Sequence, residues 1–113
     1  MPSYTPHRGD VIWADLNPQK GHEQAGKRPV LVLSPENYNE TVGLAIICPI
    51  TNQMKGYPFE VMIPEGNIVK GVILSDHIKS IDWRAREVKL IGKLPNSITD
   101  DVLEKLNTLL TVT

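Results

Sequence analysis

The strongest strand signal in the sequence is Pro29-Val30-Leu31-Val32-Leu33, a short run of β-branched and other apolar residues. A continuous apolar run of this length, closed by the turn signal Ser34-Pro35-Glu36-Asn37, predicts a strand that is buried on both faces. Two further strands are expected around it, at Asp10–Leu16, which ends at Asn17-Pro18, and at Gly43–Ile50. The first half of the chain therefore reads as β structure.

The second half of the chain adds shorter strands and one helix. Phe59–Ile63 alternates at a period of two, which is typical of a half-buried strand, and Gly71–Leu74 and Glu87–Ile91 are two more strand candidates. Near the carboxy terminus Ser97 and Asp100 fit a capping box, and apolar residues recur at helical spacing at Val102, Leu103, Leu106, Leu109 and Leu110. Five or six short strands and a helix suit a small barrel, in a single domain spanning residues 1–113.

The composition is that of an ordinary globular protein with a local excess of positive charge. The net charge of −1 argues against a general nucleic-acid coating protein. Residues 79–93, however, hold five basic against two acidic residues, which permits a phosphate-binding surface as well as a merely solvated face. With no apolar run long enough for a membrane span and no secretory signal at Met1–His7, we expect a cytoplasmic protein.

Several residue types that often form sites are expected here to be structural. Cys48 is the only cysteine and lies in an apolar run, so a buried, inert thiol is predicted. His7, His22 and His77 lie far apart in the sequence, and no spacing suggests a metal site or a cofactor motif. Trp13 and Trp83 are interpreted as core or interface anchors, with base stacking as the lesser alternative.

The connection between the first two strands, residues 17–28, is long for so small a domain. Taken alone, it could be a solvated connection or a functional loop. Its side chains suit chemistry at a phosphodiester: Arg28 can donate two hydrogen bonds to phosphate oxygens, and Lys27 can bind phosphate electrostatically. His22 or Glu23 can move protons, and the sequence does not decide between them.

Nearly the whole chain resembles the MazF/PemK family of toxin–antitoxin ribonucleases. The resemblance rests on the motif Gly-x-Glu-Gln-x-Gly-x-Arg-Pro at residues 21–29 and on Lys55-Gly56-Tyr57-Pro58-Phe59-Glu60. Gly9–Trp13, Cys48–Thr51 and Asp76–Arg84 also match, in the same order along the chain. Lys27 stands where some relatives have histidine, and Asn52 where many have serine or threonine.

The resemblance implies an SH3-like barrel of the MazF/Kid/CcdB type with a carboxy-terminal helix, active as a homodimer. It implies cleavage of single-stranded RNA without a metal or cofactor, leaving a 2′,3′-cyclic phosphate and a 5′-OH. Arg28 and Thr51 would be catalytic, with Glu23 beside them. Besides Lys27, the residues implied to bind RNA are Asn52, Gln53, Lys55, Tyr57, Phe59, Lys79 and Ser80.

The resemblance also implies a protein partner, a labile antitoxin whose acidic and apolar tail occupies the RNA groove. An alternative function on the same fold is a non-enzymatic toxin that binds a protein target, as in the group that poisons DNA gyrase. The Arg28–Thr51 pair and the Lys55–Glu60 block favour the ribonuclease. With six aromatic residues in the whole chain, a module that binds proline-rich peptides is disfavoured.

Overall fold

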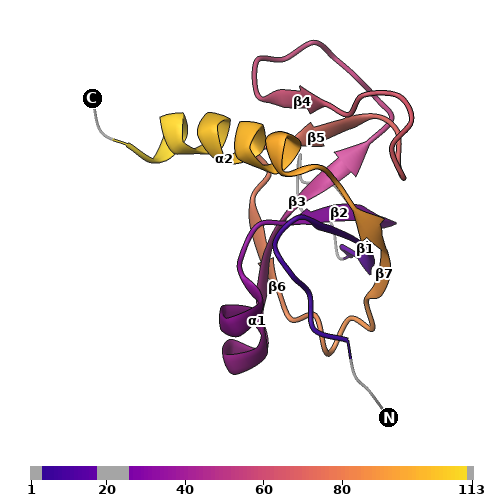
Figure 1. Ribbon diagram of the computed structural model, residues 1–113, viewed down its shortest axis with the longest axis vertical. Coiled ribbons are helices and arrows are strands. Elements are labelled where there is room, and N and C mark those ends of the chain that lie inside the picture. Colours follow the sequence, from indigo (N-terminus) through magenta and orange to yellow (C-terminus); the bar gives the residue numbers. More distant parts are fainter. Residues whose placement is uncertain (1–3, 18–25, 112–113) are drawn as a thin grey trace.

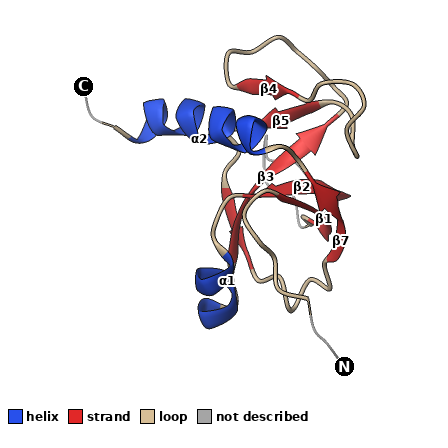
Figure 2. Ribbon diagram, viewed as in Figure 1, coloured by secondary structure: helices blue, strands red, loops and turns tan. Residues whose placement is uncertain are grey.

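The computed structural model describes residues 4–17 and 26–111. In these residues seven strands and two helices follow one another along the chain (Figures 1 and 2). Their bounds are β1 Asp10–Asp15, β2 Lys27–Val32, α1 Glu36–Val42, β3 Ala45–Thr51, β4 Glu60–Met62, β5 Val72–Leu74, β6 Lys79–Ile81, β7 Lys89–Lys93 and α2 Asn96–Leu110. Neither helix of the described residues has the length and apolar character that a membrane crossing requires.

The strands form one antiparallel sheet in the order β4-β5-β3-β2-β1-β7, with β6 paired to β3 beside this path. β3 pairs with β2 on one edge, and on its other edge with β6 near its start and with β5 near its end. The sheet therefore curves strongly, and α2 crosses one of its faces (Figure 1). The predicted mainly β, barrel-like fold with a carboxy-terminal helix is confirmed, as an open barrel whose main strand path ends at β4 and β7.

The central strands bury apolar side chains on both faces, as the run at 29–33 predicts. Leu31 and Leu33 belong to a cluster that contains Val102 and Leu106 of α2. Val30 and Val32 belong to a second cluster on the opposite face, with Ile12, Ala14, Leu16, Ala45, Ile47, Ile81 and Trp83. Each such side chain contributes about 1.5–3 kcal/mol when fully buried, so the two clusters together hold the sheet in its curved form.

Two elements were not predicted, and one boundary differs. The turn signal at residues 34–37 is followed at once by α1, and β6 was missed between two predicted strands. The last strand was expected from Glu87, but Glu87 has a φ of +50°, which interrupts an extended chain, and β7 begins at Lys89.

The predicted cap of the terminal helix is wrong. The capping residue of α2 is Pro95, which forms no side-chain capping bond, and Ser97 already lies within the helix. The carbonyl of Pro95 instead accepts the first helical hydrogen bond, from Ile98 at 3.0 Å.

α1 is fixed by Asn39, a fully buried polar side chain. Its amide donates to the carbonyls of Pro6 at 2.8 Å and Ser34 at 3.0 Å, and its Oδ1 accepts the Ser34 hydroxyl at 2.5 Å. Its own carbonyl accepts the indole N–H of Trp83 at 3.0 Å. One asparagine thus joins the amino-terminal segment, the end of β2 and the loop after β6.

Asn39→Ala is expected to destabilise the protein by about 2–3 kcal/mol, because it leaves buried polar groups without partners. The melting temperature measured by circular dichroism should fall by roughly 10 °C. Asn37→Ala is the matched control, since Asn37 is exposed on the same helix and its side chain bonds only the neighbouring amide of Tyr38. Equal effects of the two substitutions would contradict the role given to Asn39.

Candidate functional site

Arg28 and Thr51 come to the same end of two neighbouring strands. The β2–β3 ladder pairs Val30 with Pro49. Continued by two residues, the same antiparallel register puts Arg28 opposite Thr51, the last residue of β3. Because side chains alternate along a strand, Arg28 leaves β2 on the face of Val30, and Lys27 leaves it on the other face. The positions of a guanidinium and a hydroxyl thus lie on the same face of the sheet, where β2 begins and β3 ends.

The position of Thr51 is fixed by its backbone neighbours. Thr51 is only 8% exposed, and it pairs with Val72 of β5. Its Oγ1 accepts the backbone N–H of Gln53 at 3.1 Å, which leaves the hydroxyl hydrogen for another acceptor. Gly71, with a φ of +112°, approaches so closely that a Cβ there would lie 2.2 Å from the Thr51 carbonyl oxygen. The end of β3 therefore depends on a residue without a side chain.

The loop after Thr51 carries exposed polar and aromatic side chains on a tethered backbone. The Glu60 carboxylate accepts the backbone N–H groups of Lys55, at 3.1 Å, and Gly56, at 2.9 Å. Glu60 therefore shapes the loop, although in the sequence it was only part of a motif. The predicted RNA-binding residues that this loop exposes to solvent are Asn52, Gln53, Lys55 and Tyr57.

The far end of the loop is anchored to β5 and α2. The Phe59 carbonyl accepts both the backbone N–H, at 3.1 Å, and the hydroxyl of Ser75. Lys105 of α2 donates to the Pro58 carbonyl at 2.7 Å. Phe59 is half-buried by this arrangement, which leaves its ring less open to solvent than that of Tyr57.

Lys79 and Ser80 lie further from this end of the sheet. They belong to β6 and pair with Ile47 and Ile46, four and five positions before Thr51 along β3. At about 3.3 Å per residue, the distance along the strand is roughly 13 Å or more. The structure thus brings Arg28, Thr51 and the 52–59 loop together at the carboxy-terminal end of β3. Lys79 and Ser80 instead lie beside the first half of that strand.

His22 and Glu23 fall in residues 18–25, outside the described part of the chain. The residues on either side of them, Leu16 and Asn17 after β1 and Gly26 before β2, form a stem that closes this loop. Leu16 donates its N–H to the Gly26 carbonyl at 3.0 Å, directly after the paired residues of β1 and β2.

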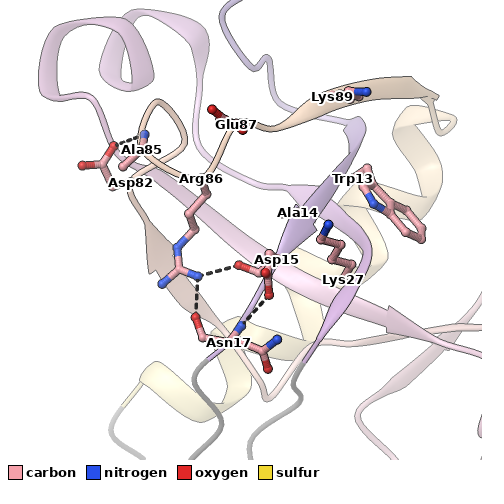
Figure 3. A pocket seen from close by; sticks show the side chains of 10 residues that line it. All are labelled: Trp13, Ala14, Asp15, Asn17, Lys27, Asp82, Ala85, Arg86, Glu87 and Lys89. Carbon is pink, nitrogen blue, oxygen red and sulfur yellow. Dashed lines mark hydrogen bonds between the residues drawn. The ribbon is translucent and has the colours of Figure 1, made fainter.

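Arg86 holds the stem from the other side, a role that sequence reasoning missed and that only the basic character of residues 79–93 could have suggested. Its guanidinium donates to the carbonyls of Asp15, at 2.5 Å, and Asn17, at 3.1 Å (Figure 3). The Asp15 carboxylate in turn accepts the N–H of Asn17 at 3.0 Å. A charged side chain and two backbone carbonyls therefore set the direction in which the chain leaves β1.

An open cleft of about 750 Å³ lies beside this stem (Figure 3). Trp13 lies at its wall with 42% of its surface exposed, so of the two expected positions, core or interface, the core position is wrong for this residue. The same expectation is confirmed for Trp83, which is 7% exposed and hydrogen-bonded to Asn39. The lining residues are Trp13, Ala14, Asp15, Asn17, Lys27, Asp82, Ala85, Arg86, Glu87 and Lys89.

Cys48 is a buried free cysteine, as predicted. Burial raises the pKa of its thiol to about 12, and the negative charge of Asp76 adds to the effect. The thiol is therefore protonated near neutral pH and does not act as a nucleophile. In the described ranges, no group of three or more histidine, cysteine, aspartate or glutamate side chains is arranged to hold a metal ion.

Comparisons with known proteins agree over nearly the whole chain. Residues 7–110 match a family model described as PemK-like, MazF-like toxin of type II toxin-antitoxin system. The chain is 46% identical over 107 residues to the endoribonuclease toxin MazF of Escherichia coli strain K12, covering 95% of this chain and 96% of that protein. It resembles the crystal structure of MazF (Form-I) from Deinococcus radiodurans, with a TM-score of 0.92, 46% identity and coverage of 96% and 98% of the two chains. It also resembles the MazE-MazF structure (Form-II) from that organism, with a TM-score of 0.88, 45% identity and coverage of 98% and 100%.

Gly71→Ala is expected to destabilise the protein by about 3 kcal/mol, through a strained φ and a clash with the Thr51 carbonyl. Gly66→Ala is the matched control: Gly66 also has a positive φ, of +89°, but nothing lies within 4 Å of its Cβ position, so the cost should be about 1 kcal/mol. Urea unfolding gives both values. Amide NMR shifts of Thr51 and Gln53 should change in the first variant alone, and equal costs would exclude the close approach.

Proposed function

The chain belongs to the PemK-like, MazF-like toxin family of type II toxin–antitoxin systems, and we propose that it is an endoribonuclease that cleaves single-stranded RNA. By cutting messenger RNA it inhibits translation and stops growth. The observation that supports this most is the register that puts Arg28 opposite Thr51, beside the exposed 52–59 loop. In this proposal one domain, residues 1–113, carries the whole activity in the cytoplasm.

The proposed reaction is attack of a 2′-OH on the adjacent phosphorus, without a metal, leaving a 2′,3′-cyclic phosphate and a 5′-OH. Arg28 stabilises the dianionic phosphorane, because its planar fork donates two hydrogen bonds to phosphate oxygens. Thr51 donates its hydroxyl hydrogen to a phosphate oxygen or holds the attacking 2′-OH, and one of the two lone pairs of its oxygen accepts the N–H of Gln53. The proton carrier is His22 or Glu23, and both remain candidates.

The RNA strand is held by the side chains that surround this pair. Asn52, Gln53, Lys55 and Tyr57 offer hydrogen bonds, a positive charge and an aromatic ring from one tethered loop. Unpaired bases are read in this way, by hydrogen bonds to their edges and by stacking. Phe59 completes the loop. Lys79 and Ser80 bind the RNA beside the first half of β3, and Lys27 binds it on the opposite face of β2 from Arg28.

The alternative, a non-enzymatic toxin of the gyrase-poisoning type, has less support. A protein-binding toxin needs neither a guanidinium and hydroxyl at one point nor a loop shaped by Glu60 to expose an aromatic ring and amides. The relative named above is an endoribonuclease, which favours the same choice.

A second copy and an antitoxin are the proposed partners. An apolar groove of about 350 Å³ lies between α1 and α2, where Tyr38 and Ile78 are 37% and 40% exposed. Exposed apolar surface of this kind marks protein interfaces, and we propose that a second copy of the chain covers it. The antitoxin, a small protein with an acidic tail, competes with RNA for the basic side chains, including Lys27 and Lys55.

Arg28→Ala is expected to lower the rate of RNA cleavage about 10²–10³-fold, by analogy with loss of one oxyanion-hole donor. Arg28→Lys should restore little, because a lysine lacks the planar fork. Cleavage of a defined transcript in EDTA, with analysis of the end groups, provides the measurement. Lys70→Gln removes an exposed positive charge elsewhere and should cut at the wild-type rate. Failure of the wild type to cut RNA in EDTA, or 5′-phosphate products, would exclude the proposed reaction.

Ile78→Asp is expected to convert the dimer into monomers, since it places a charge in the apolar groove. Light scattering coupled to size-exclusion chromatography measures the mass. Ile91→Asp is the control, because Ile91 has a similar exposure of 37% but lies on β7, outside the groove. A dimer in both variants would mean that another surface joins the two copies.

A further inference from the structure

We propose that Trp13, with Lys27 and Lys89 beside it, forms a subsite that stacks one unpaired base of the RNA outside the cleavage step. This inference rests on the proposed function and extends it to nucleotides that flank the cut. It assigns to Trp13 the base-stacking role that the sequence offered only as the lesser alternative to a core or interface anchor.

Trp13 lies on a part of the sheet face that α2 leaves uncovered. Val11, two residues earlier and on the same face of β1, is buried in the cluster that contains Val102 of α2. Trp13 lies beyond the end of this cover and is 42% exposed. It pairs with Pro29 on one side and with Lys89 on the other, so the backbone on both sides of the ring is fixed in the sheet. A large flat ring is therefore presented to solvent from a rigid strand.

The two lysines beside this ring are available to a ligand. Within residues 4–17 and 26–111, the ammonium groups of Lys27 and Lys89 form no ion pair and donate no hydrogen bond, whereas Lys93 pairs with Asp10 and Lys105 donates to the Pro58 carbonyl. The indole N–H of Trp13 likewise has no acceptor in these ranges. Three donors and one aromatic face thus point to a ligand that is both anionic and flat.

The three acidic residues of the cleft are Asp15, Asp82 and Glu87. Figure 3 shows Asp82 and Glu87 on the side of the cleft away from Trp13, and the Asp82 carboxylate accepts the N–H of Ala85 at 3.0 Å. Asp15 accepts the N–H of Asn17. The end of the cleft near Trp13 is therefore its positive end, which suits a phosphate next to a stacked base.

The subsite lies close enough to Arg28 to contact the same RNA strand. Arg28 precedes Pro29, the partner of Trp13, so the Cα atoms of Arg28 and Trp13 are separated by roughly 6 Å. Their side chains leave the sheet on opposite faces. Lys27, the residue before Arg28, leaves β2 on the face of Trp13 and so lies between the two positions.

The test uses the tryptophan itself as the reporter. The probe is an oligoribonucleotide containing the mapped cleavage sequence, blocked by a 2′-O-methyl group at the cut, made with and without several flanking nucleotides. The flanked probe should quench the fluorescence of the wild type and not that of Trp13→Phe, because Trp83, the only other tryptophan, is buried. Trp13→Ala should raise the Kd of the flanked probe about tenfold and leave that of the unflanked probe unchanged, whereas Trp13→Phe retains most of the affinity.

A charge variant tests the lysine contribution. Lys89→Gln should lower the slope of log Kd against log salt by about 0.7 for the flanked probe, as expected for one lost phosphate contact with a single strand. Lys70→Gln, an exposed lysine outside the cleft, is the control and should leave the slope unchanged.

Three results would overturn the subsite while RNA cleavage by the wild type upholds the proposed function. The first is an equal Kd of both probes for wild type and Trp13→Ala. The second is a monomeric Trp13→Ala, which would make Trp13 an interface residue. The third is quenching by an acidic peptide and not by the flanked probe, which would assign the surface to a protein partner. A wild type that cuts no RNA would instead overturn the function and the subsite together.

Discussion

The fold depends on the hydrogen bonding of β3, a strand that has neighbours along both edges. A buried strand has no water to satisfy its peptide groups, so its N–H and C=O groups must be paired within the sheet. β2 satisfies one edge, and the other is divided between β6 and β5, which pair with different halves of β3. The change of partner along one edge goes with the bend of the sheet, and the bend gives the protein two apolar clusters, one on each face.

The same constraint extends to the candidate site. Thr51 ends β3, so the pairing that fixes the strand also fixes its hydroxyl, with Gly71 supporting it from behind. Around it the charged groups with the most defined contacts, Glu60, Arg86 and Lys105, bind backbone groups rather than one another. They hold loops and strand ends in place, and the side chains left facing solvent are those suited to a ligand. Rigid support beneath exposed recognition groups is a common arrangement in binding sites.

The periodicity of apolar residues in the sequence predicted the strands that bury several apolar side chains. It did not predict the two elements that bury few of them, β6 and α1. β6 contributes Ile81 alone to a cluster, and the one buried residue of α1 is the polar Asn39, so neither element has an apolar repeat. Arg28 and Thr51 are far apart in sequence, and only family resemblance joined them before the strand register did. The exposure of Trp13 depends on where α2 stops covering the sheet, which is a property of the assembled fold and not of the strand.

The open sheet leaves β7 as an edge, and its composition has a consequence for solubility. Leu90 and Ile91 are 53% and 37% exposed on this strand, next to unpaired backbone groups that could template the strand of another molecule. Lys89 and Lys93 bracket them, and an irregularity in the β1–β7 register distorts the edge. Charge and distortion of this kind protect proteins against aggregation through their edges. Lys89 therefore helps to keep separate molecules from pairing through β7, whether or not it also binds a ligand. A substitution of Lys89 that changes ligand affinity is expected to change the tendency to self-associate as well.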